Sequence, residues 1–349
     1  MPSHDILVVG ASAGGVEALR QMAAVLPADF PAAVFVVLHV PANGKSILPH
    51  ILSRAGPLPA VHARDRQTIE KGRIYIAPPD HHLLIQPGTI RVTSGPRENS
   101  HRPAVDPLFR TAAQSYGPRA IGLVLSGGLD DGTAGLLAIK REGGLAIVQN
   151  PGDALYPSMP QSALDNVAVD YCVALSELGP LLASLFLSPA PVIQESPVAH
   201  NNPTEHDPAL DPVNYQAGMD GTPSVFGCPD CGGVLWEYQE GEMTRFRCRV
   251  GHAWTANSLL AEQAETLEAA LWAALRGLEE RAELARRLAE RTCLRNWPQS
   301  VAAFDRQGEE AKHHVDVIRR VLMRRKGLEA ADTLLPSGRA EAAPAPHDG

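Results

Sequence analysis

The chain has 349 residues, enough for two or more domains, and its apolar fraction of 44% can build a sizeable core. A formal net charge of -8 argues against binding to nucleic acid or to an acidic membrane surface. The N-terminus has no basic region followed by a long apolar one, and no apolar stretch approaches the ~20 residues that cross a bilayer. We therefore expect a cytoplasmic protein without membrane insertion.

The first predicted element is a buried strand at residues 6–9, which turns directly into a helix. The turn reads Gly-Ala-Ser-Ala-Gly at residues 10–14 and has the form of a nucleophile elbow, with Ser12 at the bend. The N–H groups of Ala13 and Gly14 would face the space beside the hydroxyl and stabilise an oxyanion. A phosphate-binding or simply tight turn is the alternative, although neither the dinucleotide nor the P-loop spacing is matched.

Two more buried strands supply candidate partners for the serine. Residues 33–38 end at His39, and residues 121–125 lead into a loop that contains Asp130 and Asp131. The carboxyl ends of parallel strands share one edge of an open sheet, so a serine, a histidine and an acid are expected to meet there. Taken singly, the histidine could be a simple strand-end residue and either aspartate a helix cap.

Later segments extend the same pattern. Strands predicted at residues 144–149 and 168–173 alternate with helices at residues 132–141 and 175–187. Such alternation indicates an α/β fold with a doubly wound, largely parallel sheet.

Several separated motifs resemble, in their order, the catalytic domain of the chemotaxis protein-glutamate methylesterases, the CheB family. They are residues 9–15, the strand ending in His39, and residues 75–83, 101–106 and 125–132, within a resemblance that runs from about residue 5 to about residue 187. The resemblance implies a Ser12, His39, Asp131 triad, the acid being the aspartate directly before Gly132. It implies a serine hydrolase that needs no cofactor for catalysis and removes methyl esters from glutamyl side chains of chemoreceptor-like proteins. Deamidation of glutamine by the same route is also implied.

The rim of the site and its control follow from the same resemblance. The chain departs from the family where the family has Ser/Thr-Gly-Met-Gly, because its own residues there are Ser-Gly-Gly-Leu. The resemblance implies a backbone donor near that methionine, and at this position the chain has Gly128. Arg102 is expected to hold an acidic substrate surface, whereas Asp106, followed by Pro107, is equally a rim residue or a helix N-cap. Typical members begin with a receiver domain; here the catalytic domain starts at residue 5, so no control by phosphorylation in cis is expected. The competing function classes are a non-catalytic signalling scaffold and a small-molecule carboxylesterase.

The C-terminal half begins with a proline-rich segment, residues 188–224, predicted to be a flexible linker. A module at residues 225–256 follows, with a C-x-x-C knuckle and a C-x-x-x-H pair that could form a closed zinc-ribbon-like site with structural zinc. Its ligands would be Cys228, Cys231, Cys248 and His252. A redox C-x-x-C would expect a βαβ context. Cys172 and Cys293 lie in apolar settings and are expected in the core.

The last segments are predicted to be helical and then disordered. Within residues 257–328, apolar residues recur in steps of four and three, which favours an antiparallel helical hairpin, with an intermolecular coiled coil as the alternative. The pattern comprises Leu260, Ala264, Leu267, Leu271, Ala274, Leu278, Val315, Ile318 and Leu322. Residues 329–349 are expected to be a disordered tail. We expect the linker to keep the two halves independent and the helices to bind a partner that holds the enzyme near its substrate.

Overall fold

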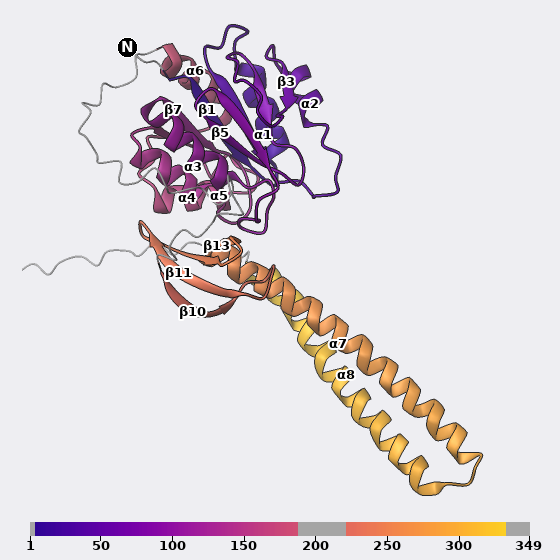
Figure 1. Ribbon diagram of the computed structural model, residues 1–349. Coiled ribbons are helices and arrows are strands. Elements are labelled where there is room, and N and C mark those ends of the chain that lie inside the picture. Colours follow the sequence, from indigo (N-terminus) through magenta and orange to yellow (C-terminus); the bar gives the residue numbers. More distant parts are fainter. Residues whose placement is uncertain (1–3, 188–220, 333–349) are drawn as a thin grey trace, which may run out of the picture. The chain divides into compact units, whose positions relative to one another are not determined.

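The computed structural model describes residues 4–187 and 221–332, which belong to two compact units divided after Glu262. The first unit contains an α/β domain and a small antiparallel sheet, and the second contains most of a helical hairpin (Figure 1). The parts of the predicted linker and tail at residues 188–220 and 333–349 lie outside the described residues.

A seven-stranded sheet, parallel at every pairing, forms the centre of the α/β domain, in the order β3-β4-β2-β1-β7-β8-β9. The three central strands are buried at every residue because helices cover both of their faces. The predicted doubly wound α/β fold is therefore confirmed. The strands are β1 (Ile6–Ala11), β2 (Ala33–Leu38), β3 (Ala60–His62), β4 (Ile74–Ile76), β7 (Ala120–Val124), β8 (Leu145–Gln149) and β9 (Tyr171–Val173).

Two apolar cores lie on opposite faces of this sheet, since successive strand side chains alternate between faces. Leu7 and Val9 pack in one core with residues of α1, α2 and α6, whereas Ile6 and Val8 pack in the other with residues of α3, α4 and α5. These helices are α1 (Gly15–Val25), α2 (Leu48–Ala55), α3 (Val105–Tyr116), α4 (Thr133–Arg141), α5 (Ser158–Asn166) and α6 (Leu175–Leu187), with a 3-10 turn at Gly117–Arg119.

Some elements of this domain differ from the sequence predictions. The short strands β3 and β4, the hairpin of β5 (His82–Gln86) and β6 (Thr89–Thr93), and helix α5 were not predicted. The expectation that Cys172 and Cys293 are core residues is wrong, because both are exposed. Cys172 lies on β9, the edge strand of the sheet, and Cys293 is the last residue of its helix.

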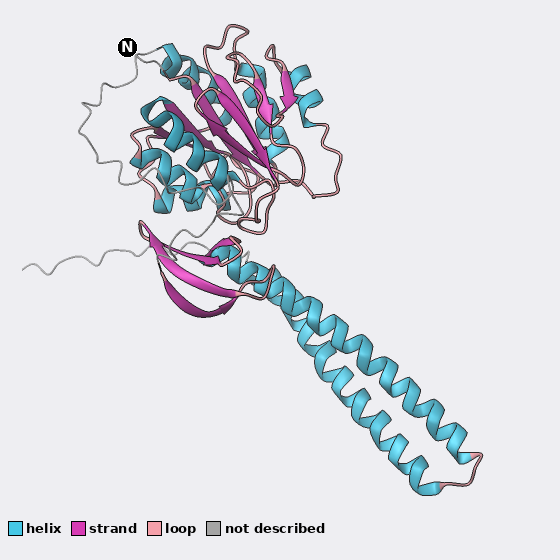
Figure 2. Cartoon of the chain, in the orientation of Figure 1, coloured by secondary structure: helices cyan, strands magenta, loops and turns pink. Residues whose placement is uncertain are grey.

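A four-stranded antiparallel sheet follows the undescribed segment (Figure 2). It consists of β10 (Thr222–Gly227), β11 (Val234–Glu240), β12 (Met243–Cys248) and β13 (Ala253–Thr255). A small core that includes Leu235, Phe246 and Trp254 packs beneath it. We call residues 222–255 the ribbon module. Its sheet leads directly into α7 (Ala256–Cys293).

The predicted helical hairpin is present, formed by α7 and α8 (Pro298–Asp332). Its apolar seam brings Leu271, Leu275 and Leu278 against Val315, Ile318 and Leu322. Leu260 and Leu267, which the predicted pattern includes, are exposed. The apolar seam of α7 instead includes Leu275, which the predicted pattern left out. In the described part of the chain, no helix is both long and apolar enough to cross a membrane.

Candidate active site

Ser12 lies in the turn between β1 and α1. The turn is closed by two backbone hydrogen bonds, from Ser12 N–H to the Ser126 carbonyl (3.0 Å) and from Gly15 N–H to the Ser12 carbonyl (2.9 Å). Gly14 takes a left-handed φ of 73°, and a Cβ there would come within 2.7 Å of Ser126 Oγ, so the turn requires glycine. The N–H groups of Ala13 and Gly14 precede α1, where no intrahelical acceptor is available to them, and can therefore bind an anion.

His39 joins Ser12 to Asp131. Its Nδ1 lies 3.1 Å from Ser12 Oγ and its Nε2 lies 2.7 Å from Asp131 Oδ2. The histidine follows β2, and its N–H donates to the Ala11 carbonyl at 3.2 Å, so strand pairing continues up to the site. The structure thus places the predicted serine, histidine and aspartate together at the carboxyl edge of the sheet.

Asp131 is fully buried among hydrogen-bond donors. Burial alone would raise the pKa of its carboxyl, but the hydrogen bond and charge of His39 and the N–H of Val105 hold that pKa well below its usual range. Further donors are Asn99 Nδ2 at 2.9 Å and Gly132 N at 3.0 Å, both to Oδ1. An ionised Asp131 accepts the proton of His39 Nε2, which leaves the lone pair of Nδ1 facing Ser12.

The neighbouring aspartate points elsewhere. Asp130 is 5% exposed, and its Oδ1 accepts a hydrogen bond from Thr255 Oγ1 at 2.8 Å. Burial raises the pKa of this carboxyl. Of the two adjacent acids, Asp131 is the one hydrogen-bonded to His39.

Asp106 is a second fully buried carboxylate beside the first. The interpretation of Asp106 as a helix N-cap is wrong, because α3 starts at Val105 with Ala104 as its cap, which places Asp106 in the first turn. Its Oδ1 accepts from Gly132 N (3.0 Å) and Gly135 N (2.8 Å). Burial raises the pKa of Asp106 to about 6, although the charge of Arg245 acts in the opposite direction.

The loop before α3 supplies two side chains to which sequence analysis assigned no role. Asn99 is buried, and its Nδ2 donates to both Asp106 and Asp131. The ring of His101 stacks on that of His39, with centroids 3.6 Å apart and planes 14° apart. Burial and the charge of His39 lower the pKa of His101 to about 4, so it is neutral at neutral pH. Nothing local in a short polar loop signals such contacts.

Two predicted rim residues are placed less simply. Arg102 Nε and Nη2 both bond Asp80 Oδ1, at 2.9 and 2.7 Å, and its Nη1 donates to the Gly95 carbonyl. Its guanidinium is thus held by the domain itself, and contact with substrate stays a prediction. Gly128 follows Gly127, at which an added Cβ would lie 2.9 Å from Ser12 Cβ, so this loop runs beside the serine. Donation by the Gly128 N–H also stays a prediction.

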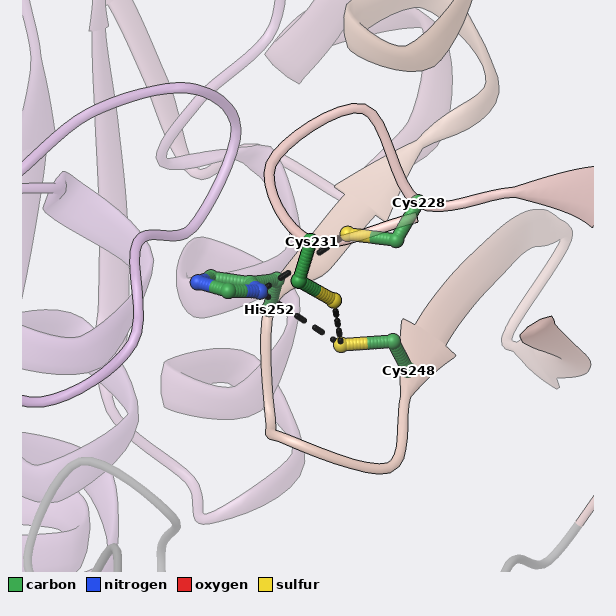
Figure 3. A group of neighbouring side chains, drawn as sticks. All are labelled: Cys228, Cys231, Cys248 and His252. Atoms are coloured by element: carbon green, nitrogen blue, oxygen red, sulfur yellow. Dashed lines mark hydrogen bonds between the residues drawn. The ribbon is translucent and has the colours of Figure 1, made fainter. Parts of the chain in front are cut away.

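The predicted metal ligands are gathered at one end of the ribbon module (Figure 3). The ligand atoms of Cys228, Cys231, Cys248 and His252 all lie within 4.8 Å of one another. The separations from His252 Nδ1 to the sulfurs of Cys228 and Cys248 are 3.7 and 3.5 Å, and the sulfurs of Cys231 and Cys248 are 3.7 Å apart. Tetrahedral Zn²⁺ with Zn–S of about 2.3 Å requires ligand atoms about 3.5–3.8 Å apart, so the donor set fits this ion.

The fold and this geometry define a class: a doubly wound α/β protein with the side-chain arrangement of a serine hydrolase. The family model described as CheB methylesterase matches residues 7–182. The chain belongs to the CheB methylesterase family.

Individual relatives agree with this assignment. The chain is 36% identical over 184 residues to a putative protein-glutamate methylesterase/protein-glutamine glutaminase of Leptospira interrogans, covering 52% of this chain and 95% of that protein. It is 36% identical over 181 residues to a protein-glutamate methylesterase/protein-glutamine glutaminase of Hydrogenovibrio crunogenus, and this match covers 51% of this chain and 48% of that protein. The crystal structure of the Thermotoga maritima CheB methylesterase catalytic domain is similar, with a TM-score of 0.51 and 31% identity, over 53% of this chain and all of that chain.

Proposed function

We propose that this protein hydrolyses methyl esters of glutamyl side chains in chemoreceptor-like proteins, and that it deamidates glutamine by the same route. The observation that carries the proposal is that the side chains of Ser12, His39 and Asp131 are linked by hydrogen bonds at the strand ends of a CheB-family domain. The relatives named for both activities support the substrate class.

In the proposed mechanism, Ser12 Oγ attacks the ester carbonyl while its proton passes to His39 Nδ1. Asp131 accepts the Nε2 proton of the ring and stabilises the imidazolium that forms. Collapse of the tetrahedral intermediate breaks the carbonyl–methoxy bond, and His39 returns the proton to the leaving group as methanol. Water, activated by the same histidine, then releases the glutamate carboxyl from Ser12. For glutamine, ammonia replaces methanol as the leaving group.

The oxyanion of each tetrahedral intermediate would be held by backbone N–H groups. The candidates are those of Ala13 and Gly14 before α1 and that of Gly128 after β7. Such donors stabilise charge that develops only in the transition state, so they raise kcat. Arg102 at the edge of the domain would contact an acidic part of the receptor.

The ribbon module would hold one structural zinc ion, which its three thiols and one imidazole fit. Thiol ligands persist in a reducing compartment, and this favours the cytoplasmic location expected from the sequence. The hairpin of α7 and α8 would bind a partner protein, since its two helices expose large apolar side chains such as Trp272 and Met323.

The test measures methanol released from a methylated chemoreceptor by the purified full chain. We expect release by the wild-type protein, and Ser12→Ala should abolish it because no nucleophile remains. A short-chain aryl ester tested in parallel separates the alternatives: a small-molecule esterase would hydrolyse only that ester, and a scaffold neither substrate. Absence of methanol release would overturn the proposal.

A further inference from the structure

Two buried carboxylates beside His39 share the same hydrogen-bond donors. The N–H of Gly132 lies 3.0 Å from both Asp106 Oδ1 and Asp131 Oδ1. Asn99 Nδ2 donates to Asp106 Oδ2 at 3.0 Å and to Asp131 Oδ1 at 2.9 Å. Like charges so close together disfavour each other in a dry site, so a cation is needed if both are to stay ionised.

Arg245 of the ribbon module supplies a cation at this position. Its Nη1 lies 2.8 Å from Asp106 Oδ2, and both side chains are 0% exposed. Its Nη2 lies 3.7 Å from Glu98 Oε2, and its Nε lies 3.8 Å from Glu240 Oε2. The residue lies on β12, outside residues 7–182 that match the family model, yet it contacts the carboxylate next to the proposed triad acid.

A second set of contacts, from the ribbon module and the first turn of α7, holds the shared donor. The carbonyl oxygen of the Asn99 side chain accepts from Thr255 N at 3.0 Å and from Ser258 Oγ at 3.1 Å. These bonds direct the amide nitrogen of Asn99 towards the two carboxylates. The backbone takes part as well, since Asn99 N–H donates to the Ala253 carbonyl at 2.8 Å.

We propose that Arg245 is a positioning residue for ester hydrolysis, which neutralises Asp106 so that Asp131 stays ionised and oriented against His39. Among the described residues, the ion pairs of Arg245 are with Asp106, Glu98 and Glu240 and not with His39, so Arg245 acts through the two carboxylates. The ribbon module is then a functional part of the active site and not a separate appendage. This inference rests on the proposed esterase function.

The first experiment compares Arg245→Met with Arg249→Met in the full chain, each checked for folding by circular dichroism and for metal content. Arg249 is exposed on the same module and controls for the loss of a positive charge there. We expect Arg245→Met to lower kcat on a small ester at least about tenfold with little change in KM, as for a group that supports only the transition state. Arg245→Lys should recover part of the loss, and Arg249→Met should match the wild type. A wild-type kcat for folded Arg245→Met would overturn the proposal.

The second experiment tests the mechanism with Asp106→Asn and the double variant Arg245→Met/Asp106→Asn. With a neutral residue at position 106, no cation is needed, so loss of Arg245 should change kcat less than about twofold relative to Asp106→Asn. If the loss of kcat in the double variant equalled the product of the losses in the two single variants, the proposal would be overturned. The double variant removes both charges of the Arg245–Asp106 pair, so it buries no unpaired charge. Its kcat relative to that of Asp106→Asn therefore tests the proposal even if Arg245→Met alone does not fold.

A third measurement does not depend on esterase activity. The proton of His39 Nε2, held by Asp131, should give a low-field resonance in the NMR spectrum. We expect Arg245→Met to shift or broaden this resonance and Arg249→Met to leave it unchanged. If the wild-type protein hydrolyses no ester, the proposed function fails, and this resonance alone decides the role of Arg245. An unchanged resonance in folded Arg245→Met would contradict that role.

Discussion

Asp130 and Asp131 are adjacent in the chain but have different partners. Asp131 Oδ2 faces His39 Nε2 at 2.7 Å, whereas Asp130 Oδ1 faces Thr255 Oγ1 at 2.8 Å. The low pKa of Asp131, caused by the His39 hydrogen bond and charge against the effect of burial, keeps it an acceptor at every pH at which the enzyme would work. Burial raises the pKa of Asp130, and the hydrogen bond from Thr255 and the charge of Arg245 offset only part of that effect.

This difference predicts unequal effects of two matched substitutions. We expect Asp131→Asn to lower kcat on a small ester by about 10⁴-fold, the loss known for the trypsin acid, because an amide no longer fixes the tautomer of His39. Asp130→Asn should change kcat by less than about tenfold, since it alters hydrogen bonds to Thr255 and Asn257 and leaves the bond between Asp131 and His39 in place. Steady-state kinetics on both variants provide the check. The reverse order of effects would identify Asp130 as the acid.

His101 should make the stability of the protein depend on pH. Burial and the charge of His39 lower the pKa of His101 to about 4 from the ordinary histidine value of 6.5, so the unfolded chain binds the extra proton more readily. The neutral ring therefore costs nothing above pH 6.5, and the free energy of unfolding falls as the pH drops from there towards 4. His101→Phe keeps an aromatic ring against His39 and removes the titration. At pH 5 the variant should recover about 2 kcal/mol relative to its effect at pH 7.5.

Urea unfolding of the wild-type protein and of His101→Phe at pH 5 and pH 7.5 measures this recovery. His81→Phe is the control for the substitution itself, at a half-buried histidine whose Nδ1 lies 2.9 Å from the carbonyl oxygen of Pro79. An equal effect of His101→Phe at both pH values would mean that His101 titrates normally in the folded protein.

At the scale of elements, local patterns predicted the segments with long apolar runs. The strands β1 and β2, which lead to Ser12 and His39, were predicted within a few residues, because a strand buried on both faces requires a continuous apolar sequence. The helices α4 and α6 were also predicted within a few residues. The three-residue strands β3 and β4 were missed because they are too short to show periodicity. Cys172 was misplaced because an edge strand leaves an apolar residue exposed.

The contacts of the ribbon module could not be read from the sequence. In the segment Thr-Arg-Phe-Arg-Cys-Arg, the three arginines at positions 245, 247 and 249 look equivalent. Only Arg245 of the three is fully buried, because it lies against Asp106 and Glu98 of the α/β domain, which are far away in the sequence. The expectation that the linker keeps the module apart from the catalytic domain is wrong, because hydrogen bonds join Thr255 to Asp130 and Arg245 to Asp106.

Metal removal should therefore affect catalysis. Cys248 ends β12, three residues after Arg245, and His252 directly precedes β13, which carries Thr255. We expect about one zinc ion per chain by elemental analysis. Chelation should unfold the module and lower small-ester turnover, with the loss of the Arg245 and Thr255 contacts. Cys231→Ser should reproduce both effects, and Cys172→Ser, at an exposed thiol outside the cluster, should cause neither. Metal-free protein with full activity would contradict both the zinc site and its effect on catalysis.

At the scale of the whole molecule, the compact unit up to Glu262 includes both the family domain and the ribbon module, and the rest of the hairpin forms the second unit. The Leptospira relative is matched over 95% of its length by 184 residues, so it is close to the family domain in size. In this chain, Asp106 of the family domain forms a buried ion pair with Arg245, which lies outside the residues that match the family model.

Two truncations separate the roles of module and hairpin. A chain that ends at residue 187 loses Arg245 and Thr255, so water reaches Asp106; we expect kcat on a small ester to fall about tenfold, as for Arg245→Met. A chain that ends at residue 277 keeps the module and the first turns of α7, and we expect its small-ester turnover to equal that of the full protein. On methylated receptor the second truncation should act more weakly than the full chain, because the hairpin no longer raises the local concentration of a bound partner. Faster small-ester turnover by the shorter chain would instead identify the ribbon module as an inhibitory cover.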